Sequence, residues 1–298
     1  MHSTLFILSI SGGGNMKYMK HKIALLADVH GNATALKAVI EDSMQEGATD
    51  YWFLGDLIMP GPGANELFEI LDSIKVSAYV KGNWEDGFLD VLNKNIDLDN
   101  ATDIYVSRLV QYQCENLDKN YINLIKNLPL HLTKQVNNLS ISVSHNLQNK
   151  NYGGDLWPTS DQKNFDELFK HDYDVAIYAH THHQLLRYSS NDQLIINPGS
   201  IGQPFYIWGK LRSDLRAQYA ILEIDETGVA EVRFKKISYD VKEELDNAIS
   251  NNLPFADLYR ETLETGKTYS HEIELLQKFI NRFNYKDEVV NFFEKKYW

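Results

Sequence analysis

The chain has 298 residues, of which 41 are acidic and 29 basic, so its formal net charge is −12. Its apolar share of 43% is ordinary for a folded protein, and its length suits one large domain or two small ones. The acidic balance argues against a nucleic-acid polymer as partner, because such binding needs an extended basic surface. The single cysteine, Cys114, excludes an internal disulfide, so we expect a cytoplasmic protein.

The first twenty residues differ in character from the rest. Their apolar stretch LFILSI is too short to span a membrane and is preceded by no lysine or arginine, so we expect neither a membrane anchor nor a signal peptide. The following SGGGN is typical of a flexible linker. We expect residues 1–20 to lie outside the fold, either as a disordered segment or because the true start is Met16 or Met19.

The next segments alternate between strand and helix patterns. Strands are predicted at 22–27, 51–56 and 77–83, with helices at 33–46 and 64–73 between them. This βαβαβ order predicts a parallel sheet with right-handed crossovers.

After residue 83 the chain has a long segment without strand patterns, followed by a segment with several. Residues 84–128 are predicted to be mostly helical, and five further strands are expected at 139–145, 174–180, 193–200, 218–225 and 229–237. Two packed sheets flanked by helices accommodate this count within one domain, residues 21–240. Residues 241–298 are predicted to be a helical appendage packed on that domain, and its aromatic end could form a homodimer contact.

Metal-binding residue types follow five of the predicted strands. Open α/β sheets place their sites at the carboxyl ends of strands, where the chain has Asp28, His30, Asp56, Asn83, His145, His180 and His182. Imidazole and carboxylate groups suit zinc, manganese and iron(II). Seven ligands exceed what one tetrahedral ion needs but fit two ions that share a carboxylate.

Asp56 is the candidate for the shared carboxylate because its strand is central, and Gly55 and Gly82 would let the backbone turn sharply beside it. Each residue also has a structural alternative. Asp28 or Asn32 could cap the helix at 33–46, and a single histidine often makes only a core hydrogen bond.

The order of these motifs, DVH, GD, GN, SH and HTH, resembles that of the calcineurin-like metallophosphoesterase family. NPGSIGQP at 197–204 and the RAQYAILEID strand extend the similarity over about residues 22–237. The resemblance implies an α/β fold, a four-layer α/β/β/α sandwich, here with added helices. It also implies a dinuclear centre that activates water for attack on phosphorus.

Carried over by position, the resemblance implies two metal sites and one bridging residue. Asp28, His30 and His182 would bind the first ion, and Asn83, His145 and His180 the second, with Asp56 shared. Asp56, Asn83 and His145 are the expected catalytic residues, and Asn32, Asn83, Trp84 and His183 the expected substrate contacts. Manganese or iron is the favoured metal, and zinc also fits.

Trp84 departs from the family pattern, because many members have a histidine there that protonates the leaving group. An indole cannot do so, which favours substrates whose leaving group needs little protonation. The indole could instead stack on a base. Of the other groups nearby, His183 could serve as an acid, whereas Glu85 and Asp86 are expected in a solvated loop.

The chain as a whole resembles bacterial hydrolases of this family that act on diadenosine tetraphosphate. The predicted activity is therefore its asymmetric hydrolysis to ATP and AMP, together with general phosphodiesterase activity. Two alternatives stay open at this point. The protein could be a phosphatase of phosphoproteins or other phosphomonoesters, or a protein-binding scaffold of the same fold.

Overall fold

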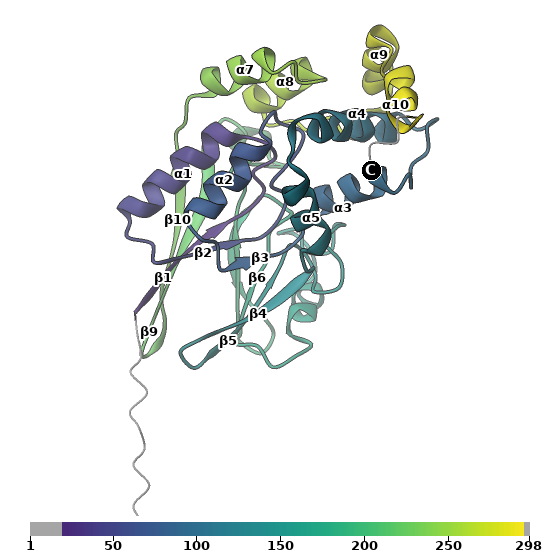
Figure 1. Cartoon of the computed structure of the whole chain (residues 1–298). Helices are drawn as coiled ribbons and strands as arrows, with labels where there is room; N and C mark the ends of the chain where they lie inside the picture. Colours follow the sequence, from purple (N-terminus) through teal and green to yellow (C-terminus); the bar gives the residue numbers. More distant parts are fainter. Residues whose placement is uncertain (1–19, 295–298) are drawn as a thin grey trace, which may run out of the picture.

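The structure is a computed structural model that describes residues 20–294 of the chain. The expectation for residues 1–20 thus falls almost entirely outside the described residues. Two five-stranded sheets form the centre of the molecule (Figure 1). The first sheet has the order β10-β9-β1-β2-β3, and its strands are β1 (His21–Leu26), β2 (Asp50–Phe53), β3 (Ala78–Tyr79), β9 (Ala217–Asp225) and β10 (Gly228–Ile237).

Within this sheet, β1, β2 and β3 run parallel, as the βαβαβ pattern predicts, while the β9–β10 hairpin pairs with β1 in the antiparallel direction. The second sheet has the order β4-β5-β6-β8-β7. Its strands are β4 (His131–Val136), β5 (Leu139–Ser144), β6 (Val175–Ile177), β7 (Gln184–Tyr188) and β8 (Leu194–Pro198). Here β5, β6 and β8 are parallel, and the two edge strands are antiparallel to their neighbours.

Alternating side chains along the strands build a core on each face of the first sheet. In β1, Ile23 and Leu25 join residues of the second sheet such as Ile177 in an apolar layer between the sheets. Ala24 and Leu26 belong instead to the larger core shared with the helices. This period of two is the strand geometry expected for a sheet that is buried on both faces.

Helices complete the two outer layers, so the predicted four-layer α/β/β/α sandwich is confirmed. The first sheet is covered by α1 (Ala33–Gln45), α2 (Asn65–Ser73), α3 (Asn83–Leu92), α4 (Ala101–Asn116) and α5 (Lys119–Asn127). The second is covered by α6 (Gln162–Asp166) and the 3-10 turn η1 (Glu167–Phe169), and a further turn, η2 (Gly209–Leu211), lies in a later loop. Between residues 20 and 294, none of the helices has both the length and the apolar run that crossing a bilayer requires.

The predicted strand set was incomplete in two places. The structure adds β4 and β7, both of which are edge strands with side chains open to solvent, such as Thr133 and Leu186. Edge strands alternate less cleanly between apolar and polar residues, so their signal in the sequence is weak. Two predicted strands are also shorter than expected, because 77–83 contains only β3 and 174–180 only β6.

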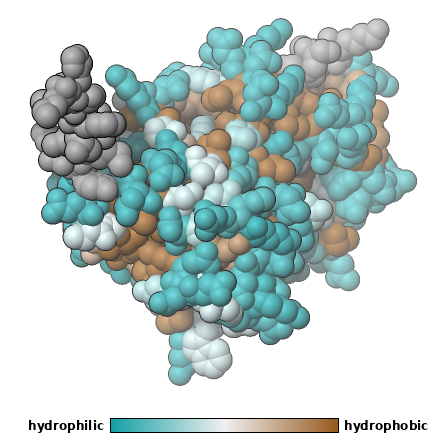
Figure 2. Space-filling view, turned by 90° about the horizontal axis from the view of Figure 1, so that it is seen from below, coloured by the Kyte–Doolittle hydropathy of each residue, from teal (hydrophilic) through white to brown (hydrophobic). Residues whose placement is uncertain are grey.

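The C-terminal helices are α7 (Val241–Ser250), α8 (Ala256–Thr265), α9 (Ile273–Phe283) and α10 (Tyr285–Glu294). Figure 1 shows α7 and α8 above α1 and α2, with α9 and α10 next to α4. Val289 and Phe292 of α10 are buried in the same core as the helices of the first sheet, and Arg108 donates to Glu288 at 2.6 Å. The face seen from below is mostly hydrophilic, with small apolar patches between polar side chains (Figure 2).

Candidate metal centre

The carboxyl ends of β1, β2, β3, β5 and β6 bring the seven predicted ligands together. Five of them have a left-handed backbone, with φ between 52° and 64°: Asp28, His30, Asp56, His180 and His182. This conformation is uncommon outside glycine and costs energy, and it is found mainly where the surrounding structure enforces it at a functional site. The turns after the strands therefore fix these side chains in place.

One glycine allows two of these turns to meet. A Cβ on Gly82 would lie 2.0 Å from Asp56 Oδ1 and 2.4 Å from the Asp56 backbone nitrogen. Only a residue without a side chain fits at that distance. The end of β3 can thus approach the end of β2 closely enough to place Asn83, the first residue of α3, beside Asp56.

The side chains form two adjacent groups. Asp28, His30 and His182 offer ligand atoms within 4.8 Å of one another, and so do Asp56, His145 and His180. Each group could hold one divalent metal ion. Asp56 Oδ2 lies 3.3 Å from His145 Nε2 and 3.7 Å from His30 Nε2, so it faces both groups. Asn83 joins the second group, with Oδ1 at 3.1 Å from His145 Nε2.

A backbone carbonyl fixes the tautomer of every histidine in the two groups. The Nδ1 atoms of His30 and His145 donate to the carbonyls of Met59 and Leu54, at 2.9 and 2.7 Å. A carbonyl oxygen can only accept, so in the neutral ring, the form that binds a metal ion, the proton sits on that nitrogen and the other nitrogen carries a lone pair. Outer hydrogen bonds of this kind orient histidines for metal binding.

His182 and His180 follow the same rule with different atoms. His182 Nδ1 donates to the carbonyl of Gln203, whereas His180 donates from Nε2 to the carbonyl of Gly153 at 3.1 Å. The free lone pair of His180 is therefore on Nδ1. In their neutral forms, four histidines from three different turns thus direct lone pairs toward the common space at the carboxyl ends of the strands.

These lone pairs face one another and face carboxylates. His30 Nε2 lies 3.1 Å from His182 Nε2, and His182 Nε2 lies 3.5 Å from Asp28 Oδ1. Asp28 is completely buried, and within residues 20–294 neither of its carboxylate oxygens has a hydrogen-bond partner. A buried charge without a partner is costly, so this donor set fits a bound cation.

The electrostatics of the two groups differ. Burial raises the pKa of Asp28 well above its usual value. Burial acts the same way on Asp56, but His145 and His30 outweigh it and lower the pKa of Asp56. Burial alone would lower the pKa of His145, but Asp56 and Asp28 reverse this and raise it to about 9. Burial and the nearby His145 lower the pKa of His180 to about 4.

Glu85 is buried in the turn rather than solvated as the sequence suggested. Its carboxylate accepts the backbone N–H groups of Asp56, Leu57 and Gly82, each at 2.8 Å. Burial and the nearby Asp56 raise its pKa to about 7. Three fixed N–H groups explain why a carboxyl belongs here, since Glu85 locks the ends of β2 and β3 together. Glu85 lies three residues before Phe88 and six before Val91, so helical periodicity puts it on the same buried face of α3. That spacing is the signal in the sequence that could have predicted its burial.

The predicted substrate contacts occupy different surroundings. Asn32 is fully buried, caps α1 by accepting from the Ala35 N–H at 2.9 Å, and donates to Tyr239 Oη at 3.1 Å. Trp84 is half-buried and donates its backbone N–H to Asp56 Oδ1 at 2.8 Å. Its ring meets His30 edge to face, with centroids 5.7 Å apart.

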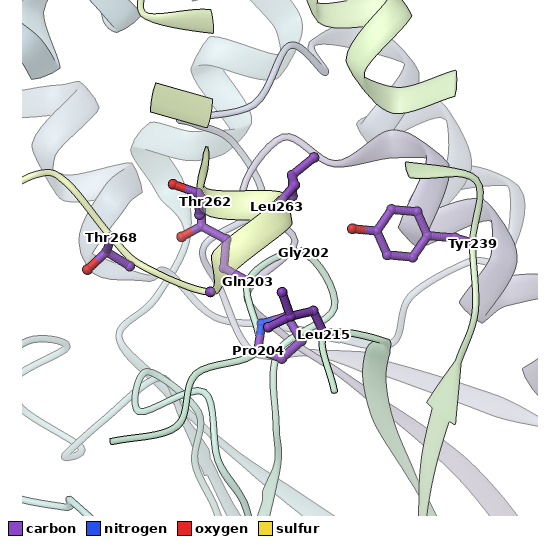
Figure 3. A pocket seen from close by; sticks show the side chains of 9 residues that line it. Gly202, Gln203, Pro204, Leu215, Tyr239, Thr262, Leu263 and Thr268 are labelled. Carbon is purple, nitrogen blue, oxygen red and sulfur yellow. The ribbon is translucent and has the colours of Figure 1, made fainter. Parts of the chain in front are cut away.

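The loop that holds His182 is supported from behind by α8. Gln203 and Pro204 face Thr262 and Leu263 across a cavity of about 10 Å³ (Figure 3). That volume is about what one water molecule requires, so the loop after β8 packs closely against α8 here.

Comparison with known proteins identifies the family. The calcineurin-like phosphoesterase superfamily domain matches residues 21–227. The chain belongs to this superfamily. An uncharacterized protein of Methanocaldococcus jannaschii, MJ0912, is 25% identical over 251 residues, which cover 79% of this chain and 95% of that protein.

Two solved structures share the fold of this phosphoesterase. The hypothetical protein PH1004 of Pyrococcus horikoshii OT3 has a TM-score of 0.66 at 19% identity, with 83% of this chain and 99% of that one covered. A metallophosphoesterase of Sphaerobacter thermophilus has a TM-score of 0.60 at 22% identity, with 83% and 100% covered. The expected superfamily and fold are thus confirmed, and the two ligand groups fit divalent metal ions.

Proposed function

We propose that this phosphoesterase hydrolyses phosphoanhydride and phosphodiester bonds with two bound divalent ions. Asp28, His30 and His182 would hold one ion and Asn83, His145 and His180 the other, with Asp56 between them. The observation that carries the proposal is the pair of facing lone pairs beside the unpartnered carboxylate of Asp28. Manganese or iron(II) suits imidazole, carboxylate and amide ligands at least as well as zinc does.

When bound, such ions polarise the phosphoryl group and make water a stronger nucleophile. The chain's own residues position these parts. The four carbonyl-bound histidines and Glu85 hold the donor atoms in one arrangement before substrate arrives, which reduces the reorganisation needed during reaction. Asn83 opens α3 at the edge of the centre, where its amide could also contact a phosphoryl oxygen.

The surroundings of Trp84 favour substrates with good leaving groups. Its indole cannot donate a proton, Glu85 is occupied by three N–H groups, and Asp86 is paired with Lys81 at 2.6 Å. A polyphosphate leaves more readily than an alkoxide. We therefore propose diadenosine tetraphosphate as the substrate, cleaved asymmetrically to ATP and AMP, with model phosphodiesters as further substrates.

The test is to incubate manganese-loaded protein with diadenosine tetraphosphate and separate the nucleotide products. ATP with AMP supports the proposal, whereas two ADP would contradict asymmetric cleavage. If only bis(p-nitrophenyl) phosphate is cleaved, the nucleotide assignment is wrong and the phosphodiesterase stands. Preferential turnover of phosphoserine peptides would favour a phosphatase, and no turnover of any ester would favour a scaffold. The His182→Asn variant serves as the inactive control.

A further inference from the structure

Two loops border the metal centre on the side of His180 and His182, and both are tied to these ligands. The loop at 146–160 provides the Gly153 carbonyl that accepts from His180. The loop at 202–214 provides the Gln203 carbonyl for His182, and its Phe205 N–H donates to the His182 carbonyl at 3.5 Å. The parts of these loops around Gly153 and Phe205 therefore lie at the rim of the centre.

Four half-exposed rings from these loops and from the HTHH segment form one cluster, which we call the aromatic wall: Trp157, His183, Phe205 and Tyr206. Ring centroids of His183 lie 5.5 Å from Trp157, 5.8 Å from Phe205 and 5.9 Å from Tyr206. All three contacts are edge to face, with interplanar angles of 75° to 77°. Edge-to-face packing leaves parts of the ring faces open to a planar ligand.

The aromatic wall is held in position by polar contacts behind it. Tyr206 Oη accepts from Gln218 Nε2 at 2.8 Å and from Lys236 Nζ at 3.0 Å. Arg212 donates from Nε to the Tyr206 carbonyl at 2.8 Å. Trp157 follows the fully buried Leu156, whose carbonyl accepts from Tyr178 Oη. A rigid surface of this kind loses little entropy when it binds a ligand.

The segment that follows the aromatic wall exposes apolar side chains. Trp208 is 66% exposed, Ile207 58% and Leu211 53%. Single exposed apolar residues are common, but these three lie within residues 207–211, directly after the aromatic wall in the chain, so the segment is a candidate extension of that surface. Trp84, by contrast, packs against the core and presents its ring to His30. The open aromatic surface near the centre is thus the wall and not Trp84.

We propose that the aromatic wall and Trp208 bind the nucleobase of a nucleotide ester whose phosphorus lies at the metal centre. This proposal rests on the proposed phosphodiesterase function and assigns its specificity. A nucleobase is the occupant that the arrangement favours, because a substituent on the phosphorus must extend over the rim, and aromatic faces bind any base by stacking. The formal net charge of −12 argues against a nucleic-acid polymer as the ligand and favours a small nucleotide.

The experiment compares two esters with the same leaving group. Thymidine 5′-(p-nitrophenyl phosphate) carries a base, and methyl p-nitrophenyl phosphate does not. The ratio of their kcat/KM values should favour the nucleoside ester in the wild type. It should fall by about 5- to 150-fold in Trp157→Leu and in Trp208→Leu, the range expected for loss of one base–aromatic contact. Tyr188→Leu, an exposed tyrosine on β7, should keep the wild-type ratio.

The outcomes separate this proposal from the function on which it rests. If the wild type cleaves both esters and neither tryptophan variant changes the ratio, the aromatic wall does not bind the base and the phosphodiesterase stands. If the metal-loaded wild type cleaves neither ester, the proposed function itself fails. Calorimetric titration with AMP and with ribose 5-phosphate repeats the comparison without turnover, and equal affinities in the wild type would also overturn the proposal.

Discussion

The Nε2 atoms of His30 and His182 lie 3.1 Å apart although the Nδ1 atom of each ring donates to a backbone carbonyl. Both neutral rings therefore direct lone pairs at the same point. Without a cation this contact is repulsive, and burial lowers the pKa of both rings, which opposes protonation as a remedy. The chain has thus arranged acceptors for a metal ion before the ion is present.

Replacing His182 with asparagine should weaken the binding of one metal ion selectively. The wild type, stripped with chelator and titrated with Mn²⁺, should bind two ions, and His182→Asn should lose the ion shared with Asp28 and His30. Activity should fall by more than the roughly 10- to 100-fold that loss of an outer hydrogen-bond partner costs. His183→Asn is the matched control and should still bind two ions. Equal stoichiometry in His182→Asn and the wild type would contradict the assignment.

Gly82, which directly precedes α3, and Gly87, which lies within it, should respond in opposite ways to alanine. In Gly82→Ala the new Cβ would collide with Asp56, so we expect about 1–3 kcal/mol of destabilisation and impaired metal binding. In Gly87→Ala the Cβ would meet only Val106 Cγ1, at 3.8 Å, so the helix should gain up to about 1 kcal/mol. Urea unfolding measures both effects. A Gly82→Ala protein as stable as Gly87→Ala would refute the close approach of β2 and β3.

The sequence was sufficient to predict the layers and to bring the seven ligands to one edge of the sheets. Both follow from local patterns, since apolar runs define buried strands and polar residues directly after them share the carboxyl edge. Asp28 and His145, for example, are 117 positions apart, yet their strands end at the same place, with His145 Nε2 at 3.9 Å from Asp28 Oδ1.

The parts that escaped prediction depend on contacts between distant segments. The carbonyls of Met59 and Gly153 fix histidine tautomers, but any residue has a carbonyl, so no side-chain pattern marks them. The guanidinium of Arg187 on β7 lies 3.6 Å from the centre of the Phe165 ring on α6, and nothing in either segment alone indicates that contact. Such contacts depend on how distant segments pack, so they cannot be predicted from composition or periodicity.

The buried carboxyl of Glu244 should make stability depend on pH. It accepts from Thr34 Oγ1 at 2.7 Å and from Tyr259 Oη at 2.9 Å, and burial raises its pKa above the ordinary value of 4.5. Between 4.5 and the raised value, the folded state binds more protons than the unfolded state, so this contribution to stability is complete below the window and is lost as the pH rises through it.

The Glu244→Gln variant removes that titration. The free energy of unfolding of the wild type minus that of the variant should therefore decrease as the pH rises across the window. Urea unfolding of chelator-treated proteins at pH values below and above the window measures this difference, and titration of the metal ligands cancels between the two proteins. A difference that stays constant with pH would show that Glu244 keeps the same pKa in both states.

Trp84 should control how strongly the rate depends on the leaving group. In the wild type the indole of Trp84 cannot protonate the leaving group. In a series of methyl phosphate diesters, kcat/KM should therefore fall steeply as the leaving group becomes more basic. Trp84→His introduces an imidazole beside His30 that could protonate the leaving group. Diesters with alkyl leaving groups should then be hydrolysed at least about 10-fold faster, which is less than the full rate gain that a well-placed general acid supplies. The p-nitrophenyl ester should change little, because its leaving group departs without a proton. Trp84→Phe, aromatic but unable to donate, should keep the wild-type slope, and a histidine variant with that same slope would place the missing acid elsewhere.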